Sequence, residues 1–82
     1  MTKQQLVIAS IEAEIERAEK KHPHWPDDYI HQAAIVAEEA GELVRAALND
    51  YYENGQTPAG LEEIRKEAIQ TAATCIRLLK NL

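Results

Sequence analysis

The sequence is poor in the residues that build a thick core or a disulfide framework. It has no Phe, one Trp and three Tyr among 82 residues, so its hydrophobic share of 45% is mostly Ala, Ile, Leu and Val. Its one cysteine, Cys75, excludes an intrachain disulfide. A chain this short buries only about 60% of its unfolded surface and is marginal alone. We therefore expect thin helical layers that assemble into a homodimer or a homotetramer.

Positive charge is also scarce. Nine Lys plus Arg stand against fourteen Asp plus Glu, which gives a net charge of −5 and disfavours the basic surface that duplex nucleic acid selects. Long apolar runs are lacking, and the N-terminal "LVIA" is too short and too soon followed by Glu12 and Glu14 to be a signal peptide. We expect a soluble, cytoplasmic protein without a membrane segment, and one domain over residues 1–82.

Two short breaks divide the chain into three predicted helices. The breaks are "HPHWPDD" at residues 22–28 and "NGQTP" at residues 54–58, and the helices cover roughly residues 3–21, 28–53 and 58–82. The fold class is therefore all-α.

Capping residues support these boundaries. Thr2 followed by Gln5 is a capping-box pattern at the start of the first helix. Asp27 or Asp28 is suited to cap the second helix. At the start of the third helix, Thr57 is a candidate N-cap with Pro58 at the first helical position, and the preceding Asn54-Gly55 supplies a turn.

The second and third helices each carry a continuous apolar seam. We expect the two helices to pack antiparallel through these seams, and the seams of two subunits to complete a four-helix-type bundle by dimerisation. In the second helix the seam consists of Ile30, Ala34, Ala37, Gly41, Val44, Leu48 and Tyr51, and in the third of Leu61, Ile64, Ala68, Ala72, Cys75, Leu79 and Leu82.

The second helix also carries three carboxylates within "AEEAGEL", namely Glu38, Glu39 and Glu42. At about 100° per residue they share an arc of roughly 100° beside the seam. One interpretation is a solvated face partly neutralised by Arg45. The other is a divalent-cation site, because Mg²⁺ prefers oxygen ligands and glutamates at i, i+3 can reach one ion. The third helix offers Glu67, followed three residues later by a glutamine, at the same spacing.

Together "EEAGE" at 38–42 and "EAIQ" at 67–70 resemble the EExxE…ExxD signature of the all-α nucleoside triphosphate pyrophosphohydrolases, the MazG-like superfamily. The resemblance extends from about Ile30 to Leu79. It implies that Glu39, Glu42 and Glu67 ligate Mg²⁺, with Mn²⁺ as a substitute. It further implies that the substrate is a nucleotide cleaved between its α and β phosphates.

The resemblance also implies a catalytic part for Glu38, which would ligate a further ion or orient the attacking water. Gln70 stands where the family has aspartate. Its carbonyl oxygen can still coordinate a hard cation but adds no charge, so we expect weaker metal binding, one ion fewer or lost activity. Many members of the superfamily carry a further helix after this segment, which helps to close the nucleotide site. Only twelve residues follow Gln70 here, so the resemblance implies that this wall either comes from another subunit or is absent.

The first break and several arginines are candidates for substrate contacts. Trp25, His22, His24 and Tyr29 can stack on or hydrogen-bond a base, whereas the alternative for Trp25 is a hydrophobic staple at the start of the second helix. A zinc site at the two histidines lacks a third ligand. The candidates for phosphate contacts, each also explained by surface salt bridges or a solvated face, are Arg45, Arg77 and, more weakly, Lys66, Lys80 and Asn81.

The predicted function is Mg²⁺-dependent hydrolysis of a nucleoside or deoxynucleoside triphosphate to the monophosphate and pyrophosphate. Two alternatives stay open. One is a non-catalytic helical binding module of the same family. The other is a small interaction protein whose acidic face keeps a helical dimer soluble.

Overall fold

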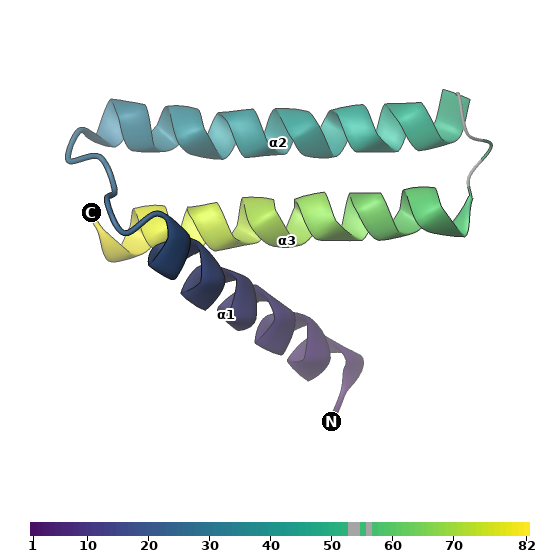
Figure 1. Ribbon diagram of the computed structural model, residues 1–82, viewed down its shortest axis with the longest axis horizontal. Coiled ribbons are helices and arrows are strands. Elements are labelled where there is room, and N and C mark those ends of the chain that lie inside the picture. The colour runs from purple at the N-terminus through teal and green to yellow at the C-terminus, as the bar shows by residue number, and fades with distance from the viewer. Residues whose placement is uncertain (53–54, 56) are drawn as a thin grey trace.

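The computed structural model describes residues 1–52, 55 and 57–82, and within these it contains three helices and no strand. The helices are α1 (Lys3–Lys21), α2 (Tyr29–Tyr52) and α3 (Pro58–Lys80) (Figure 1). The predicted all-α class is confirmed. The expected helix boundaries agree closely, while Glu53 and Asn54, placed in the second helix and the following turn, lie outside the described residues.

Local hydrogen bonds explain where α1 and α2 begin. The predicted capping box is present: Gln5 N donates to Thr2 Oγ1 over 3.1 Å, and Thr2 N donates to Gln5 Oε1 over 2.8 Å. Of the two aspartates considered for α2, Asp28 serves, because its Oδ1 accepts from Ile30 N at 2.9 Å. These caps satisfy backbone N–H groups that have no partner within the helix.

The start of α3 is fixed from both sides. Thr57 is the N-cap as predicted, and its Oγ1 accepts from Gly60 N at 3.0 Å. Asp50 near the end of α2 holds the cap in place, because its Oδ1 accepts from Thr57 N at 2.9 Å. Gly55 has a φ of 69°, a left-handed conformation that suits glycine in a turn. The hairpin of α2 and α3 is therefore closed by specific contacts.

Helices α2 and α3 run antiparallel beside one another, and α1 crosses α3 diagonally (Figure 1). Packing joins α2 to α3 and α1 to α3. Near the C-terminal end of α1, Glu19 Oε2 lies 2.9 Å from Lys80 Nζ, and this ion pair joins α1 to the C-terminal end of α3. This placement brings the predicted acidic residues of α2 and α3 together inside the hairpin.

The expectation that α2 and α3 pack through their apolar seams is wrong. Every residue of the α2 seam is exposed, including Ile30 at 68% and Val44 at 56%. In α3 the seam residues Leu61 and Leu79 are exposed as well. At about 100° per residue, the side of α2 that faces α3 lies roughly 170° around the helix axis from the seam, on the opposite side of the helix. The α2 seam therefore lies on the outside of the hairpin, whereas the α3 seam is half-buried at Ile64, Ala72 and Cys75.

Polar residues occupy the inner side of α2. Gln32 and Asp50 are buried with exposures of 2% and 3%, and Glu39 between them is partly buried. Gln32 Nε2 donates to the backbone oxygen of Pro26 at 2.7 Å. The inner row, in which polar and apolar residues are mixed at steps of three or four, consists of Gln32, Ile35, Glu39, Leu43, Ala46 and Asp50.

A single chain has little apolar core. Among the described residues, the buried hydrophobic side chains are Ile15 and Ala73. The radius of gyration is 13.9 Å, compared with about 11.7 Å for a compact domain of this length. The accessible surface is 6030 Å², compared with about 4,900 Å² for a folded monomer of this mass. None of the helices in the described ranges is long and apolar enough to span a membrane.

Candidate metal centre

Three glutamates from two helices converge inside the hairpin. Glu39 and Glu42 stand one turn apart on α2, and Glu67 projects from α3 opposite them. Each offers one carboxylate oxygen, and these oxygens all lie within 4.8 Å of one another. The antiparallel packing of α2 on α3 thus produces a three-carboxylate cluster, which we call the acidic centre.

Two oxygens of the acidic centre are buried without a hydrogen-bond donor. They are Glu39 Oε2 and Glu67 Oε2, and the Glu67 residue as a whole is only 9% exposed. A buried charge without a partner is costly, because desolvation is not offset by a hydrogen bond or a counterion. The acidic centre therefore holds two acceptors that a cation would satisfy.

The pKa values of the two buried carboxyls respond to this environment. Burial raises the pKa of Glu39 above its ordinary value, and the charges of Glu42 and Glu67 raise it further. Burial also raises the pKa of Glu67, together with the charges of Glu42 and Glu63, while the neighbouring Lys66 acts in the opposite direction. The charged forms of both side chains are thus disfavoured in the metal-free protein.

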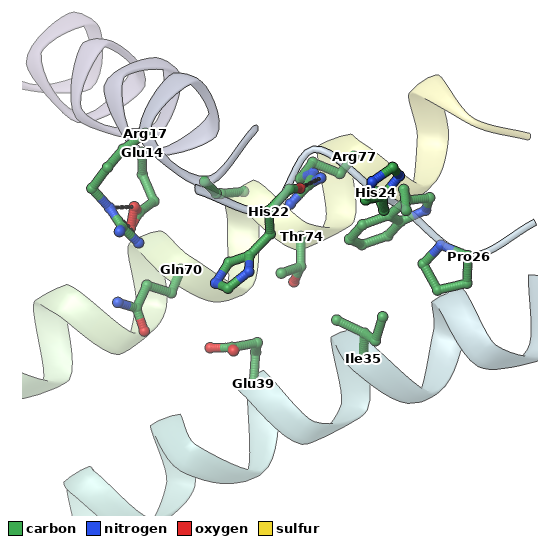
Figure 2. A pocket seen from close by; sticks show the side chains of 13 residues that line it. Glu14, Arg17, His22, His24, Pro26, Ile35, Glu39, Gln70, Thr74 and Arg77 are labelled. Carbon is green, nitrogen blue, oxygen red and sulfur yellow. Dashed lines mark hydrogen bonds and ion pairs between the residues drawn. The ribbon is translucent and has the colours of Figure 1, made fainter. Parts of the chain in front are cut away.

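A pocket of about 290 Å³ opens beside the acidic centre, and we call it the central pocket. Glu39 and Gln70 are part of its lining. Figure 2 shows their side chains projecting into it from α2 and α3, with the His22 ring directed toward the space between them. Gln70, three residues after Glu67 on α3, therefore shares a pocket with one member of the acidic centre.

An aromatic and cationic wall closes the other end of the central pocket. The Arg77 guanidinium lies 4.5 Å from the centroid of the Trp25 ring, a cation–π contact. Arg77 is only 6% exposed, and its Nη2 donates to the backbone oxygen of His22 at 2.8 Å. Trp25 and Arg77 both line the pocket, as does His24. The first break of the sequence is thereby fastened to the end of α3.

The other residues predicted to contact substrate or to act in catalysis do not line the central pocket. Tyr29 and Arg45 are exposed and lie outside the described residues that line the central pocket. Glu38 is exposed and lies outside the three-carboxylate cluster, although its charge contributes to the raised pKa of Glu39. Of the residues singled out for substrate contacts, His22, His24, Trp25 and Arg77 are brought together.

Two residues of α1 in this region were not anticipated from the sequence. The Glu14 side chain is only 12% exposed and lines the central pocket together with Arg17. Arg17 binds it as a fork: Nε donates to Oε2 at 2.7 Å and Nη2 donates to Oε1 at 2.8 Å. Their i, i+3 spacing predicts this pair, but the contact of α1 with the middle of α3 is what brings it to Gln70.

The acidic centre is chemically suited to Mg²⁺ or Mn²⁺. Both ions take oxygen ligands, and Mg²⁺ is commonly held by a few carboxylates while retaining waters for a substrate phosphate. Glu39, Glu42 and Glu67 supply three such carboxylates, and the two oxygens without donors are free to ligate. A comparison with protein-family models, curated proteins and solved structures finds no match to this chain.

Proposed function

We propose that the protein hydrolyses a nucleoside or deoxynucleoside triphosphate to the monophosphate and pyrophosphate, using Mg²⁺ or Mn²⁺ held at the acidic centre. The observation that carries the proposal is the convergence of three glutamates from α2 and α3, two of them with buried oxygens that lack a donor. The central pocket beside it, at about 290 Å³, lies at the lower end of the volumes of small-ligand pockets. A cytoplasmic location, where such nucleotides are abundant, belongs to the proposal.

Each group has a defined part in this reaction. Glu39, Glu42, Glu67 and the Gln70 carbonyl would hold the cation, which neutralises phosphate oxygens and lowers the pKa of a bound water. Glu38 would position the attacking water or a further ion. A bond forms from the water oxygen to the α phosphorus, and the bond from that phosphorus to the α–β bridging oxygen breaks. Pyrophosphate is then the leaving group.

The aromatic wall would receive the nucleoside. The base would pack on the side chains of His22 and Trp25, which both line the central pocket. Arg77 holds the Trp25 ring from one side and is therefore better suited to fix this wall than to bind a phosphate directly. Tyr29 and Arg45, both exposed and away from the pocket, would take part only if a second subunit placed them there.

A homodimer, or a homotetramer built from it, is part of the proposal, with the outer apolar seams completing a four-helix-type bundle. Support comes from the continuous exposure of the α2 seam and from the surface excess of about 1,100 Å² over that of a compact monomer. A standard protein interface buries about 800 Å² per partner, so the excess is sufficient for one.

The reaction is tested by measuring pyrophosphate release from a panel of nucleotides with and without Mg²⁺. We expect release that requires the metal and that falls at least about a hundredfold in Glu67→Gln. Glu12→Gln is the matched control, because it removes the same charge from an exposed position of α1. If no nucleotide is cleaved at high protein concentration, the enzyme proposal is wrong.

Two further results would favour the alternatives. Mg²⁺-dependent nucleotide binding without cleavage would indicate a binding module of the same architecture, with Gln70 as the reason for lost turnover. A melting temperature unchanged by Mg²⁺ and Mn²⁺ would indicate that the acidic centre serves only the solubility of a helical dimer.

A further inference from the structure

A second hollow, of about 380 Å³, lies between α1 and α3 next to the central pocket, and we call it the basic groove. Three cationic side chains line it, those of Arg17, Arg65 and Lys66, against two acidic ones, Glu14 and Glu62. A local excess of positive charge is notable in a chain with a net charge of −5. The groove therefore has an excess of one positive charge, because Arg17 is paired with Glu14 and Arg65 with Glu62, and Lys66 is the cation that an anion can meet without competition.

Helix geometry explains how the groove forms. On α3, its lining residues follow the i, i+3, i+4, i+7 spacing of a single helix face, which α1 crosses. On α1, Glu14 and Arg17 stand one turn apart and complete the opposite wall. Ile69 forms part of the lining as well. The groove is thus built from two helices.

The basic groove joins the central pocket at the end that Gln70 lines. Glu14, Arg17 and Gln70 line both hollows. Figure 2 shows the Arg17–Glu14 pair of α1 beside Gln70 of α3, at the end of the central pocket away from Pro26. A ligand held at the acidic centre can therefore extend past Gln70 into the groove.

Two cationic side chains of the groove, Arg65 and Lys66, can contact an anion without losing a strong interaction. Arg65 Nε lies 3.3 Å from Glu62 Oε1, and both side chains are more than half exposed, so the pair contributes little to stability. Lys66 is exposed and makes no ion pair with any described residue. An anionic group that contacts Lys66 and Arg65 would gain charge-assisted hydrogen bonds without breaking the partly buried Arg17–Glu14 pair.

We infer that the basic groove binds the terminal phosphates of the substrate and so selects triphosphates over monophosphates. The inference rests on the proposed function, in which the pyrophosphate portion leaves from the acidic centre. Lys66 and Arg65 would contact the pyrophosphate oxygens, with Arg17 bridging between the two hollows. The groove is a binding site for the leaving group, separate from the carboxylates that hold the cation.

The test is titration of the full chain with inorganic pyrophosphate in the presence of Mg²⁺, followed by calorimetry. We expect Lys66→Gln and Arg65→Gln each to weaken binding about tenfold, the effect of one lost charge-assisted contact. Lys20→Gln is the matched control: it removes the same charge from an exposed α1 lysine paired with Glu16 at 3.3 Å, outside the groove, and should bind as the wild type does.

A second measurement concerns nucleotides. Lys66→Gln should weaken binding of a nucleoside triphosphate about tenfold and leave that of the corresponding monophosphate unchanged. The inference is overturned if wild-type protein does not bind pyrophosphate, if Lys20→Gln loses as much affinity as Lys66→Gln, or if mono- and triphosphate binding fall equally.

The two proposals fail separately. If a nucleotide is cleaved and Lys66→Gln binds pyrophosphate as tightly as the wild type, the groove is not the binding site, and the proposed reaction is unaffected. If Lys66→Gln weakens pyrophosphate binding but no nucleotide is cleaved, the anion site is confirmed and the proposed reaction is wrong.

Discussion

The two sides of α2 differ in a way that reverses the usual arrangement of a small protein. The side facing α3 carries carboxylates and amides, including Gln32, Glu39 and Asp50, whereas the outer side carries Ile30, Val44 and other apolar residues. Apolar burial is the main favourable term in folding, and buried charges are a cost. This difference supports the two proposals made above, that the inner side binds a ligand and that the outer side associates with a second copy of the chain.

The outer side gives the largest expected effect. Replacing both Val44 and Leu48 by Glu should dissociate the proposed oligomer, because each such side chain contributes about 1.5–3 kcal/mol when buried and a glutamate there opposes association. Light scattering should show the monomer mass, with a lower melting temperature. Asn49→Glu, an exposed position beside the seam, is the control. A wild-type protein that is already monomeric would contradict the expectation.

The second largest effect is expected on the inner side of α2, where Asp50 contacts Gly60 of α3. A Cβ at Gly60 would clash with the Asp50 carboxylate and approach its Cβ to 2.9 Å, so Gly60→Ala should cost about 1–3 kcal/mol in the free energy of unfolding. Denaturant unfolding measures this. In an Asp50→Gly background, which removes both the carboxylate and the Cβ, the same substitution should cost much less. An equal cost in both backgrounds would rule out the clash as the cause.

The third prediction concerns Gln70 of α3 and asks whether this residue contacts a cation held at the acidic centre. Gln70→Asp should tighten Mg²⁺ binding about tenfold, because a charged oxygen ligand replaces a neutral one. Calorimetric titration with Mg²⁺ provides the measurement. Gln70→Asn shortens the side chain equally without adding charge, and it should not tighten binding. Unchanged or weaker binding in the aspartate variant would mean that position 70 does not face the ion.

The smallest expected effect is the pH dependence of the metal-free protein. The pKa values of Glu39 and Glu67 are raised in the folded state, so protonation favours folding and the carboxylate forms oppose it. Stability should therefore fall as the pH rises from the ordinary glutamate pKa through the raised values. Mg²⁺ should remove this loss, and its stabilising effect should grow with pH.

Melting temperatures across this pH range, with a chelator and with Mg²⁺, provide the measurement. Glu39→Gln should flatten the metal-free profile and raise stability by about 1 kcal/mol or less, because it removes like-charge repulsion. A profile that is flat in the wild type would show that the two carboxyls titrate normally.

Helix boundaries could be predicted from the sequence because they depend on local contacts. Thr2 with Gln5, and Thr57 with Pro58, act within one helical turn and need no tertiary information. The pairing of faces could not be predicted in the same way. A 4–3 apolar pattern shows that a face is suited to burial, but it does not specify whether the same chain or another one covers it.

The acidic centre was predictable from the sequence in its residues but not in its surroundings. Glu39, Glu42 and Glu67 stand out by spacing, and the structure brings them together. Arg17 and Arg65 do not stand out, because each forms an ordinary i, i+3 pair and their common groove depends on how α1 crosses α3. Their position is set by contacts between distant segments, which the local pattern does not record.

Arg77 links parts of the chain that are 55 residues apart. Its side chain holds the backbone of His22 and the ring of Trp25, and its own carbonyl accepts from Asn81 Nδ2 at 2.7 Å. Fraying of the last turns of α3 would release the α1–α2 connection at the same time. Amide protons of the two segments should therefore exchange with solvent at a shared opening rate, as one cooperative unit.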